Sequence, residues 1–340
     1  MKRLQPTDYM YASARVRALE NRLVGRERME LLAECRSAGE VTDRLAEYGL
    51  TLPEADTPAT GEVIGRLRES MLLSAMKEAY DEVEAAVPDP AVFRYFRYPY
   101  DCNNLKAAIK CGIRDVSAED MLFDFGTVPA DEVEATVREG NYEAFPPRMA
   151  SAALRARELY DKTGDPRMID AVLDRACYED MLAAAEATGD DTLVGWLRMR
   201  IDLTNILITL RVLRLGKGFS AGGVAEDLLL PGGTLDADFF GEAFESGEGS
   251  LWSALSPTEY YPLLKVEGDP RPLYAVEKAC DDLFVERVRA DANTPFGAAV
   301  AGGYLIGWET AVKNIRILLA AKEAGWSAET IRERIRVSYV

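Results

Sequence analysis

One helical motif occurs three times along the chain, and this repeat constrains the fold more than any other feature. Each copy has an asparagine before an aliphatic residue, then a glycine, then a Ser-Ala pair. Copies 1, 2 and 3 read "NLKAAIKCGIRDVSA", "NILITLRVLRLGKGFSA" and "NIRILLAAKEAGWSA", beginning at Asn104, Asn205 and Asn314. A period near 105 residues exceeds the roughly 20 to 50 residues of ordinary solenoid repeats. Each copy can therefore belong to a small helical domain with its own core.

The motif predicts a helix, a turn and a second helix. Aliphatic residues one and five positions after the asparagine share a helix face, so that face is buried. A glycine ends the first helix and a serine caps the second by accepting hydrogen bonds from backbone N–H groups. The glycine and serine are Gly112 and Ser117, Gly216 and Ser220, and Gly325 and Ser327. We expect the asparagine to satisfy backbone groups between helices.

Basic side chains recur on the first helix of each copy. They are Lys106 and Lys110 in copy 1, Arg211 and Arg214 in copy 2, and Lys313, Arg316 and Lys322 in copy 3. A solvated flank of a helical core is the simplest interpretation, and a surface for a partner is the alternative. Together with Asn104, Asn205 and Asn314 they form the set of candidate interface or repeat-motif residues.

The whole chain reads as all-α, because no segment alternates apolar and polar residues with a period of two. The repeat suggests three similar domains over residues 1–122, 123–228 and 229–340. Three such domains can close around a pseudo-threefold axis and leave a central opening, as in a funnel. The Gly-rich, acidic stretch 228–250 is interpreted as a connector between domains.

Composition excludes several classes of function. The formal net charge of −17 argues against nucleic-acid binding, which needs a cationic surface. The longest uncharged run, "FGAAVAGGYLIGW" at residues 296–308, is too short to cross a bilayer and is expected to be a buried helix. No transmembrane segment is therefore predicted. The five cysteines lack a paired spacing and are expected to be reduced core residues in a cytosolic protein.

No catalytic, cofactor or metal site can be assigned. The chain has no histidine, which removes the commonest general base and transition-metal ligand. It also lacks the G-x-x-x-x-G-K-[ST] phosphate loop. An all-α enzyme that uses Mg²⁺ and a diphosphate is one alternative, with "DDLFVE" at residues 281–286 as its candidate. A generic helical scaffold is another.

The chain resembles the C subunit of the V/A-type rotary ATPases, which corresponds to the d subunit of the vacuolar enzyme. Four segments carry the resemblance, which covers essentially the full length. They are "YMYASARVRALENRLVGRERMELLAE", "YFRYPYDCNNLKAAIK", "RMRIDLTNILITLR" and "NIRILLAAKEAGWSAETIRERIRVSYV". The last of these is the most specific.

The resemblance implies a non-catalytic, all-helical rotor subunit with no cofactor. It implies partners on two sides, the central axle subunits of the D and F type and the membrane proteolipid c-ring, with the chain on the cytoplasmic face. By transmitting torque, the subunit would couple ATP turnover in the complex to the transport of H⁺ or Na⁺. On this basis we expect the repeated basic residues to face the axle opening.

Overall fold

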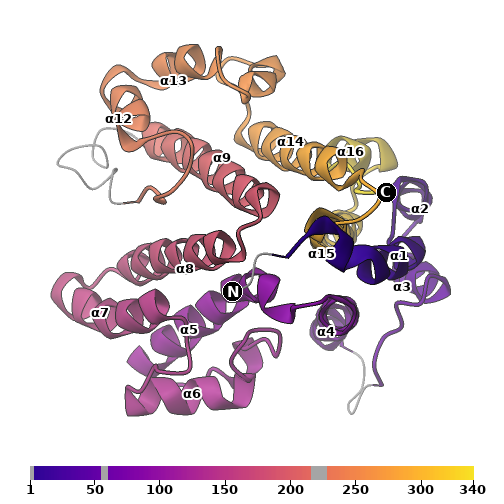
Figure 1. Ribbon diagram of the computed structural model, residues 1–340, viewed down its shortest axis with the longest axis horizontal. Coiled ribbons are helices and arrows are strands. Elements are labelled where there is room, and N and C mark those ends of the chain that lie inside the picture. Colours follow the sequence, from indigo (N-terminus) through magenta and orange to yellow (C-terminus); the bar gives the residue numbers. More distant parts are fainter. Residues whose placement is uncertain (1–3, 55–59, 216–227) are drawn as a thin grey trace. The chain divides into compact units, whose positions relative to one another are not determined.

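The structure is a computed structural model that describes residues 4–54, 60–215 and 228–340 (Figure 1). Within these ranges the regular structure is α-helix and short 3-10 helix, without a strand. This confirms the all-α prediction. The chain divides into two compact units: unit 1 comprises Ala91–Glu267, and unit 2 combines Leu4–Pro90 with Gly268–Val340. The three domain ranges given above stay a prediction.

Unit 1 carries copies 1 and 2 of the motif. Its α-helices are α5 (Tyr98–Ile113), α6 (Ala130–Glu139), α7 (Pro147–Thr163), α8 (Arg167–Thr188), α9 (Asp191–Leu215), α12 (Ala237–Ser246) and α13 (Glu248–Leu255). Helix α8 contacts α5, α7 and α9, so it connects the two helices that begin the motif copies. Helices α7 and α8 are followed by Gly164 and Gly189 in the left-handed region, where glycine is the usual residue.

Unit 2 carries copy 3 and combines both ends of the described chain. Its α-helices are α1 (Met10–Leu19), α2 (Arg26–Ala33), α3 (Ala38–Glu47), α4 (Gly61–Ala86), α14 (Leu273–Ala292), α15 (Ala298–Glu323) and α16 (Ala328–Arg334). The first and last segments are joined by direct hydrogen bonds. Gly297 N–H donates to Ser13 Oγ at 3.2 Å, and Arg17 Nη2 donates to the Ala292 carbonyl at 2.5 Å.

Helix α15 is the centre of unit 2. It contacts α1, α2, α3, α4, α14 and α16, and Figure 1 shows it among these helices. Every residue from Ala298 to Trp308 is buried, which confirms that the uncharged run at 296–308 forms a core helix. Within the described ranges, no helix combines the length and the apolar character needed to cross a membrane.

Two local predictions are wrong. The supposed connector at 228–250 contains α12, because Phe240 and Ala243 form a buried stripe that outweighs the glycines and acids around it. Gly112 does not end α5, which continues to Ile113; the residue with left-handed backbone is Asp115, at φ 56°. Gly325, at φ 73°, does follow α15 as predicted. Gly216 and Ser220 lie outside the described residues.

The cysteines and the serine cap of copy 3 agree with the sequence-based expectation. All five cysteines are free and buried. Ser327 caps α16 by accepting from Thr330 N–H at 3.2 Å, as predicted. In copy 1 the capping position of the 3-10 helix Glu119–Met121 is Ala118 and not Ser117, although the Ser117 hydroxyl accepts from Glu119 N–H at 3.2 Å. The thiols therefore serve as small core side chains.

Candidate functional site

The motif asparagine makes the same two hydrogen bonds in every copy. Its amide NH₂ donates to a backbone carbonyl in the segment that follows, and its carbonyl oxygen accepts from the N–H of that same residue. The pairs are Asn104 with Phe123 at 2.8 and 2.9 Å, Asn205 with Leu230 at 2.8 and 2.8 Å, and Asn314 with Arg336 at 3.0 and 2.9 Å. The asparagine thus fixes the returning chain against the motif helix. This agrees with the prediction that it satisfies backbone groups between helices.

Copies 1 and 2 add a buried carboxyl group one helical turn before the asparagine. In copy 1, Asp101 accepts from the N–H and hydroxyl of Thr127 at 2.8 and 2.7 Å and from Val128 N–H at 3.1 Å. In copy 2, Asp202 accepts from Thr234 N–H at 2.9 Å and Leu235 N–H at 3.0 Å, as well as from the Thr234 hydroxyl. The two loops are therefore held in the same way.

A glycine lets each loop approach its aspartate closely. A Cβ atom on Gly126 would collide with Asp101 Oδ1, and one on Gly233 would collide with Asp202 Oδ1. Burial raises the pKa of Asp101, while the hydrogen bonds from Thr127 and Val128 act against that increase.

Copy 3 has neither the carboxyl group nor the loop glycine. The position of the aspartate is Ala311, and the position of the loop glycine is Tyr339, three residues after Arg336. The Tyr339 ring lies against Gly303 and Gly307 of α15, where a Cβ on Gly307 would stand only 2.8 Å from Tyr339 Cδ1. An aromatic ring against bare helix backbone thus replaces a buried carboxyl group against a glycine loop.

Tyr339 gives unit 2 a pH-dependent stability. Burial raises the pKa of its hydroxyl to about 12, whereas a tyrosine in the unfolded chain has a pKa of about 10. The unfolded state releases this proton first, so the group's contribution is complete below about pH 10 and is lost as the pH rises towards 12. We expect Tyr339→Phe to change the unfolding free energy by less than about 1 kcal/mol at neutral pH, and to lose less stability than the parent above pH 10.

Urea unfolding followed by circular dichroism, at neutral pH and at about pH 11.5, measures this difference. Tyr11→Phe is the matched control, because Tyr11 is 66% exposed and the same atom is removed. Equal alkaline losses for the parent protein and Tyr339→Phe would contradict the assignment.

Most of the predicted basic residues contact groups of neighbouring helices within their own unit. Lys106 and Lys110 of α5 pair with Asp174 and Asp170 of α8, each at 2.5 Å. Burial acts to lower the pKa of Lys106, but Cys102 and Asp174 beside it leave that pKa raised overall. These two lysines therefore join α5 to α8.

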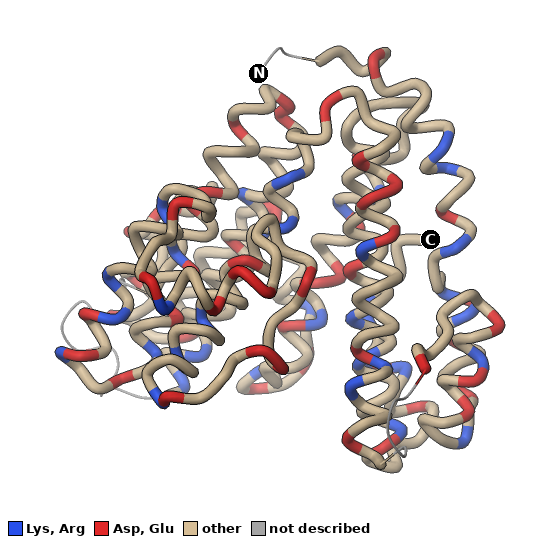
Figure 2. Tube along the Cα trace, turned by 90° about the horizontal axis from the view of Figure 1, so that it is seen from below, with Lys and Arg blue, Asp and Glu red and all other residues tan. Residues whose placement is uncertain are grey.

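The other basic residues of the set behave similarly where their contacts are resolved. Their contacts are Arg214 Nη2 with Glu248 at 2.7 Å, Lys313 with Asp281 at 2.6 Å, Arg316 Nε with Glu69 at 3.0 Å, and Lys322 with the Ala33 carbonyl at 2.7 Å. Arg211 is exposed on α9. Figure 2 shows acidic and basic residues interspersed along the helices.

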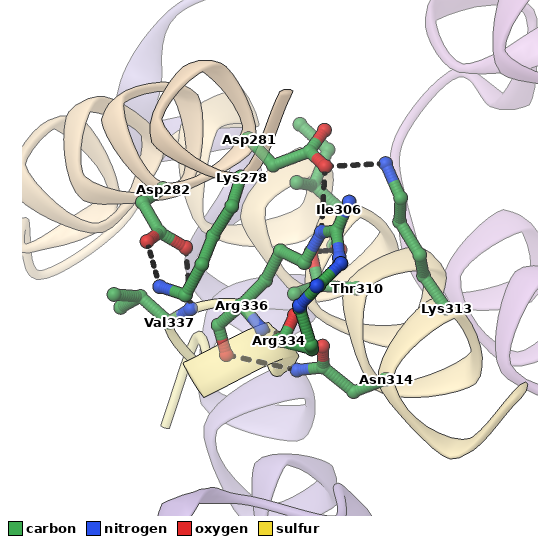
Figure 3. A network of polar contacts seen from close by, with 10 residues as sticks. All are labelled: Lys278, Asp281, Asp282, Ile306, Thr310, Lys313, Asn314, Arg334, Arg336 and Val337. Carbon is green, nitrogen blue, oxygen red and sulfur yellow. Dashed lines mark hydrogen bonds and ion pairs between the residues drawn. The ribbon is translucent and has the colours of Figure 1, made fainter. Parts of the chain in front are cut away.

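A polar network joins α14, α15 and the last described segment (Figure 3). Asp281 accepts from Lys313 at 2.6 Å and from Arg336 Nε at 2.9 Å. Asp282 accepts from Lys278 at 2.5 Å and from Val337 N–H at 2.7 Å. Asp281 and Asp282, which belong to the Mg²⁺ candidate segment, thus bind basic side chains and one backbone N–H group. Among the described residues, no three His, Cys, Asp or Glu side chains are arranged to hold a metal ion.

Sequence reasoning found the asparagines but missed the carboxyl groups that accompany them. The missed residues are Asp101, Gly126 and Thr127 in copy 1, and Asp202, Gly233 and Thr234 in copy 2. A signal was present: D-x-x-N occurs in copies 1 and 2, and each has a Gly-Thr-aliphatic triplet downstream. Copy 3 lacks both elements, so a search for features common to all three copies passes over them.

The family model described as ATP synthase (C/AC39) subunit matches residues 12–334. The C subunit of the A-type ATP synthase of Thermococcus kodakarensis is 25% identical, covering 96% of this chain and 90% of its own. The C subunit of the V-type sodium ATPase of Enterococcus hirae is 23% identical, covering 80% of this chain and 82% of its own. These matches confirm the resemblance drawn from the sequence.

Proposed function

The chain belongs to the ATP synthase (C/AC39) subunit family, and on that premise we propose that it is a rotor subunit of the central stalk. It is the C subunit of a V/A-type ATPase rather than an enzyme in its own right. The proposed role is to link the D- and F-type axle subunits to the membrane proteolipid ring and to transmit torque between them, on the cytoplasmic face. The family match over residues 12–334 carries this proposal.

The packing of each unit suits a part that transmits torque. Three asparagine side chains fix returning segments to helices, and in copies 1 and 2 a buried aspartate holds the same segment a few residues further on. Contacts of this kind raise resistance to local opening, because each loop can move only after several hydrogen bonds break together. The proposed arrangement is three similar helical domains around an opening that receives the axle.

The test is reconstitution with the proposed partners. The purified full chain is mixed with detergent-solubilised proteolipid ring and with the axle subunits, and complexes are separated by size exclusion. We expect co-elution with both partners. As a positive control, the same ring and axle preparations must bind a family member of known assembly. If they do, failure of this chain to co-elute with either partner would contradict the rotor role.

We also propose that the basic residues of the repeat contact the axle. Lys313 is about half exposed and Arg211 is exposed, so Arg211→Glu with Lys313→Glu is expected to weaken co-elution with the axle. Arg138→Glu with Arg175→Glu is the charge-matched control, because Arg138 on α6 and Arg175 on α8 are 74% and 45% exposed and lie outside the motif. An equal effect of the control would mean that net charge, and not Arg211 and Lys313 themselves, governs association.

A further inference from the structure

A cavity of about 430 Å³ lies within unit 2, bordered by α2, α14, α16 and the segment after α16. Its wall is strongly basic in an otherwise acidic chain. The basic side chains are Arg26, Lys278, Arg289, Arg332 and Arg336, and Glu30 is the single acidic residue of the wall. Four of these cations have carboxylate partners, so the guanidinium of Arg289 supplies the unbalanced positive charge that attracts an anion here.

Carboxylates hold four of the five cations but leave donors unused. The pairs are Arg26–Glu30 at 3.0 Å, Lys278–Asp282 at 2.5 Å, Arg336–Asp281 at 2.9 Å, and Arg332–Glu34. A guanidinium has five N–H donors. Arg26 uses only Nε in its pair, and Arg332 uses only one terminal nitrogen. Each can still donate to a second anion.

Arg289 is the exception within this wall. It is exposed on α14, and its guanidinium makes no hydrogen bond or ion pair with any described part of the chain. A guanidinium without an internal partner can bind phosphate through two parallel N–H donors.

The wall is fixed before any ligand arrives. Arg336 is held at both its backbone N–H and its carbonyl by Asn314, and Val337 N–H donates to Asp282 (Figure 3). A binding site that is already ordered loses little conformational entropy when it is filled. The third copy of the repeat thus positions the basic wall.

The remaining lining is apolar. Met29 and Ala33 of α2 face the cavity together with Ile335 and Val337. A volume of about 430 Å³ falls in the range of small-molecule sites, which combine an apolar lining with a few convergent polar groups. An inorganic ion alone would leave this lining in water, whereas an organic phosphate would cover it.

We propose that this pocket binds a phosphate-bearing organic ligand, with its phosphate on Arg289, Arg332 and Arg336 and its organic part against Met29 and Val337. A soluble organic polyphosphate and the headgroup of an anionic phospholipid offer the same chemistry. The proposal does not depend on the rotor function, because it concerns the isolated chain.

The experiment uses the full chain at about 0.15 M salt, so that weak surface attraction is screened. Isothermal titration calorimetry follows adenosine triphosphate and pyrophosphate, and flotation follows vesicles of phosphatidylglycerol or phosphatidylcholine. Two variants, Arg289→Gln and the pair Arg289→Gln with Arg332→Gln, remove pocket donors. Arg287→Gln is the matched control, because Arg287 is exposed on the same helix, pairs with Asp291 at 2.7 Å, and is not part of the wall.

We expect saturable binding that weakens about tenfold or more in the double variant, as the loss of charge-assisted hydrogen bonds implies, and that is unchanged in Arg287→Gln. Thermal unfolding of each variant verifies that it is folded. Binding of the soluble probes identifies a soluble phosphate, and binding confined to phosphatidylglycerol vesicles identifies a headgroup. Absence of saturable binding to every probe, or an equal loss in Arg287→Gln, would overturn the proposal.

Discussion

Replacing Asn104 with leucine is expected to lower the free energy of unfolding by about 2 to 4 kcal/mol. The side chain is fully buried, and it satisfies both backbone groups of Phe123. Leucine has a similar volume but cannot hydrogen-bond, so the N–H and carbonyl of Phe123 lose their partners. An unpaired buried donor or acceptor costs about 1 to 3 kcal/mol. Phe123 is only partly buried, so each of its two groups is expected to cost about 1 to 2 kcal/mol, and the two together give the expected total.

The neighbouring residue supplies a close chemical control. Asn103 is exposed and its side chain makes no hydrogen bond with any described residue, so Asn103→Leu is expected to change stability by no more than about 0.5 kcal/mol. Urea unfolding of the full chain gives both values, and hydrogen exchange of peptides around residues 119–128 locates the loosened segment. A loss below about 1 kcal/mol for Asn104→Leu would show that water replaces the amide at this position.

The helical pattern and the asparagines could be predicted from sequence because both depend on local information. A buried stripe on a helix follows from spacing, and a polar residue repeated within such a stripe must find a partner. The identity of that partner could not be predicted, since Phe123, Leu230 and Arg336 lie 19, 25 and 22 residues downstream in loops of different length. Only the folded chain fixes where each loop returns.

The contacts of the basic residues could not be predicted from sequence. Their periodicity predicts one face of a helix, but not what covers that face. Lys106 meets an aspartate 68 residues later and Arg316 meets a glutamate 247 residues earlier. Helix pairing determines these contacts, and a single sequence holds no direct record of it. The same holds for the basic pocket, whose wall comes from three segments that are far apart in the chain.

The three copies solve one packing problem with two sets of residues. Copies 1 and 2 place a carboxyl group beneath a glycine loop, whereas copy 3 places Tyr339 on Gly303 and Gly307. If only the loop of copy 1 or copy 2 were replaced, the buried carboxyl group would lose its hydrogen-bond donors. If only the helix glycines of copy 3 were replaced, the Tyr339 ring would have no space. The pairs must therefore change together, which explains why this part of the motif is visible only when the loops and helices are seen side by side.

The largest loss of stability is expected for Asp202→Ala, at about 3 to 5 kcal/mol. Asp202 is fully buried, and its carboxyl group receives hydrogen bonds from both the N–H and the hydroxyl of Thr234 and from Leu235 N–H. It also receives one from the Tyr260 hydroxyl at 2.7 Å. Alanine removes the acceptor of all these donors at once and leaves a cavity between α9 and the loop.

The substitution Tyr260→Phe measures how much one of the hydrogen bonds to Asp202 contributes to stability. Burial, together with the hydrogen bond to Asp202, raises the pKa of the Tyr260 hydroxyl, so this tyrosine stays a donor throughout the neutral range. Its removal alone is expected to cost about 1 kcal/mol. In Asp202→Ala the same change should cost less, because the hydroxyl has already lost its acceptor, and the difference is the coupling energy of the pair.

Asp238→Ala is the control for the removal of an acid from the same unit, because Asp238 is exposed and forms no hydrogen bond with any described residue. Its stability should stay within about 0.5 kcal/mol of the parent. Urea unfolding of the four variants, including the double variant, provides every value in the cycle. If Asp202→Ala lost no more than Asp238→Ala, or if the Tyr260→Phe effect were the same in both backgrounds, Asp202 would not be the group that holds this loop to α9.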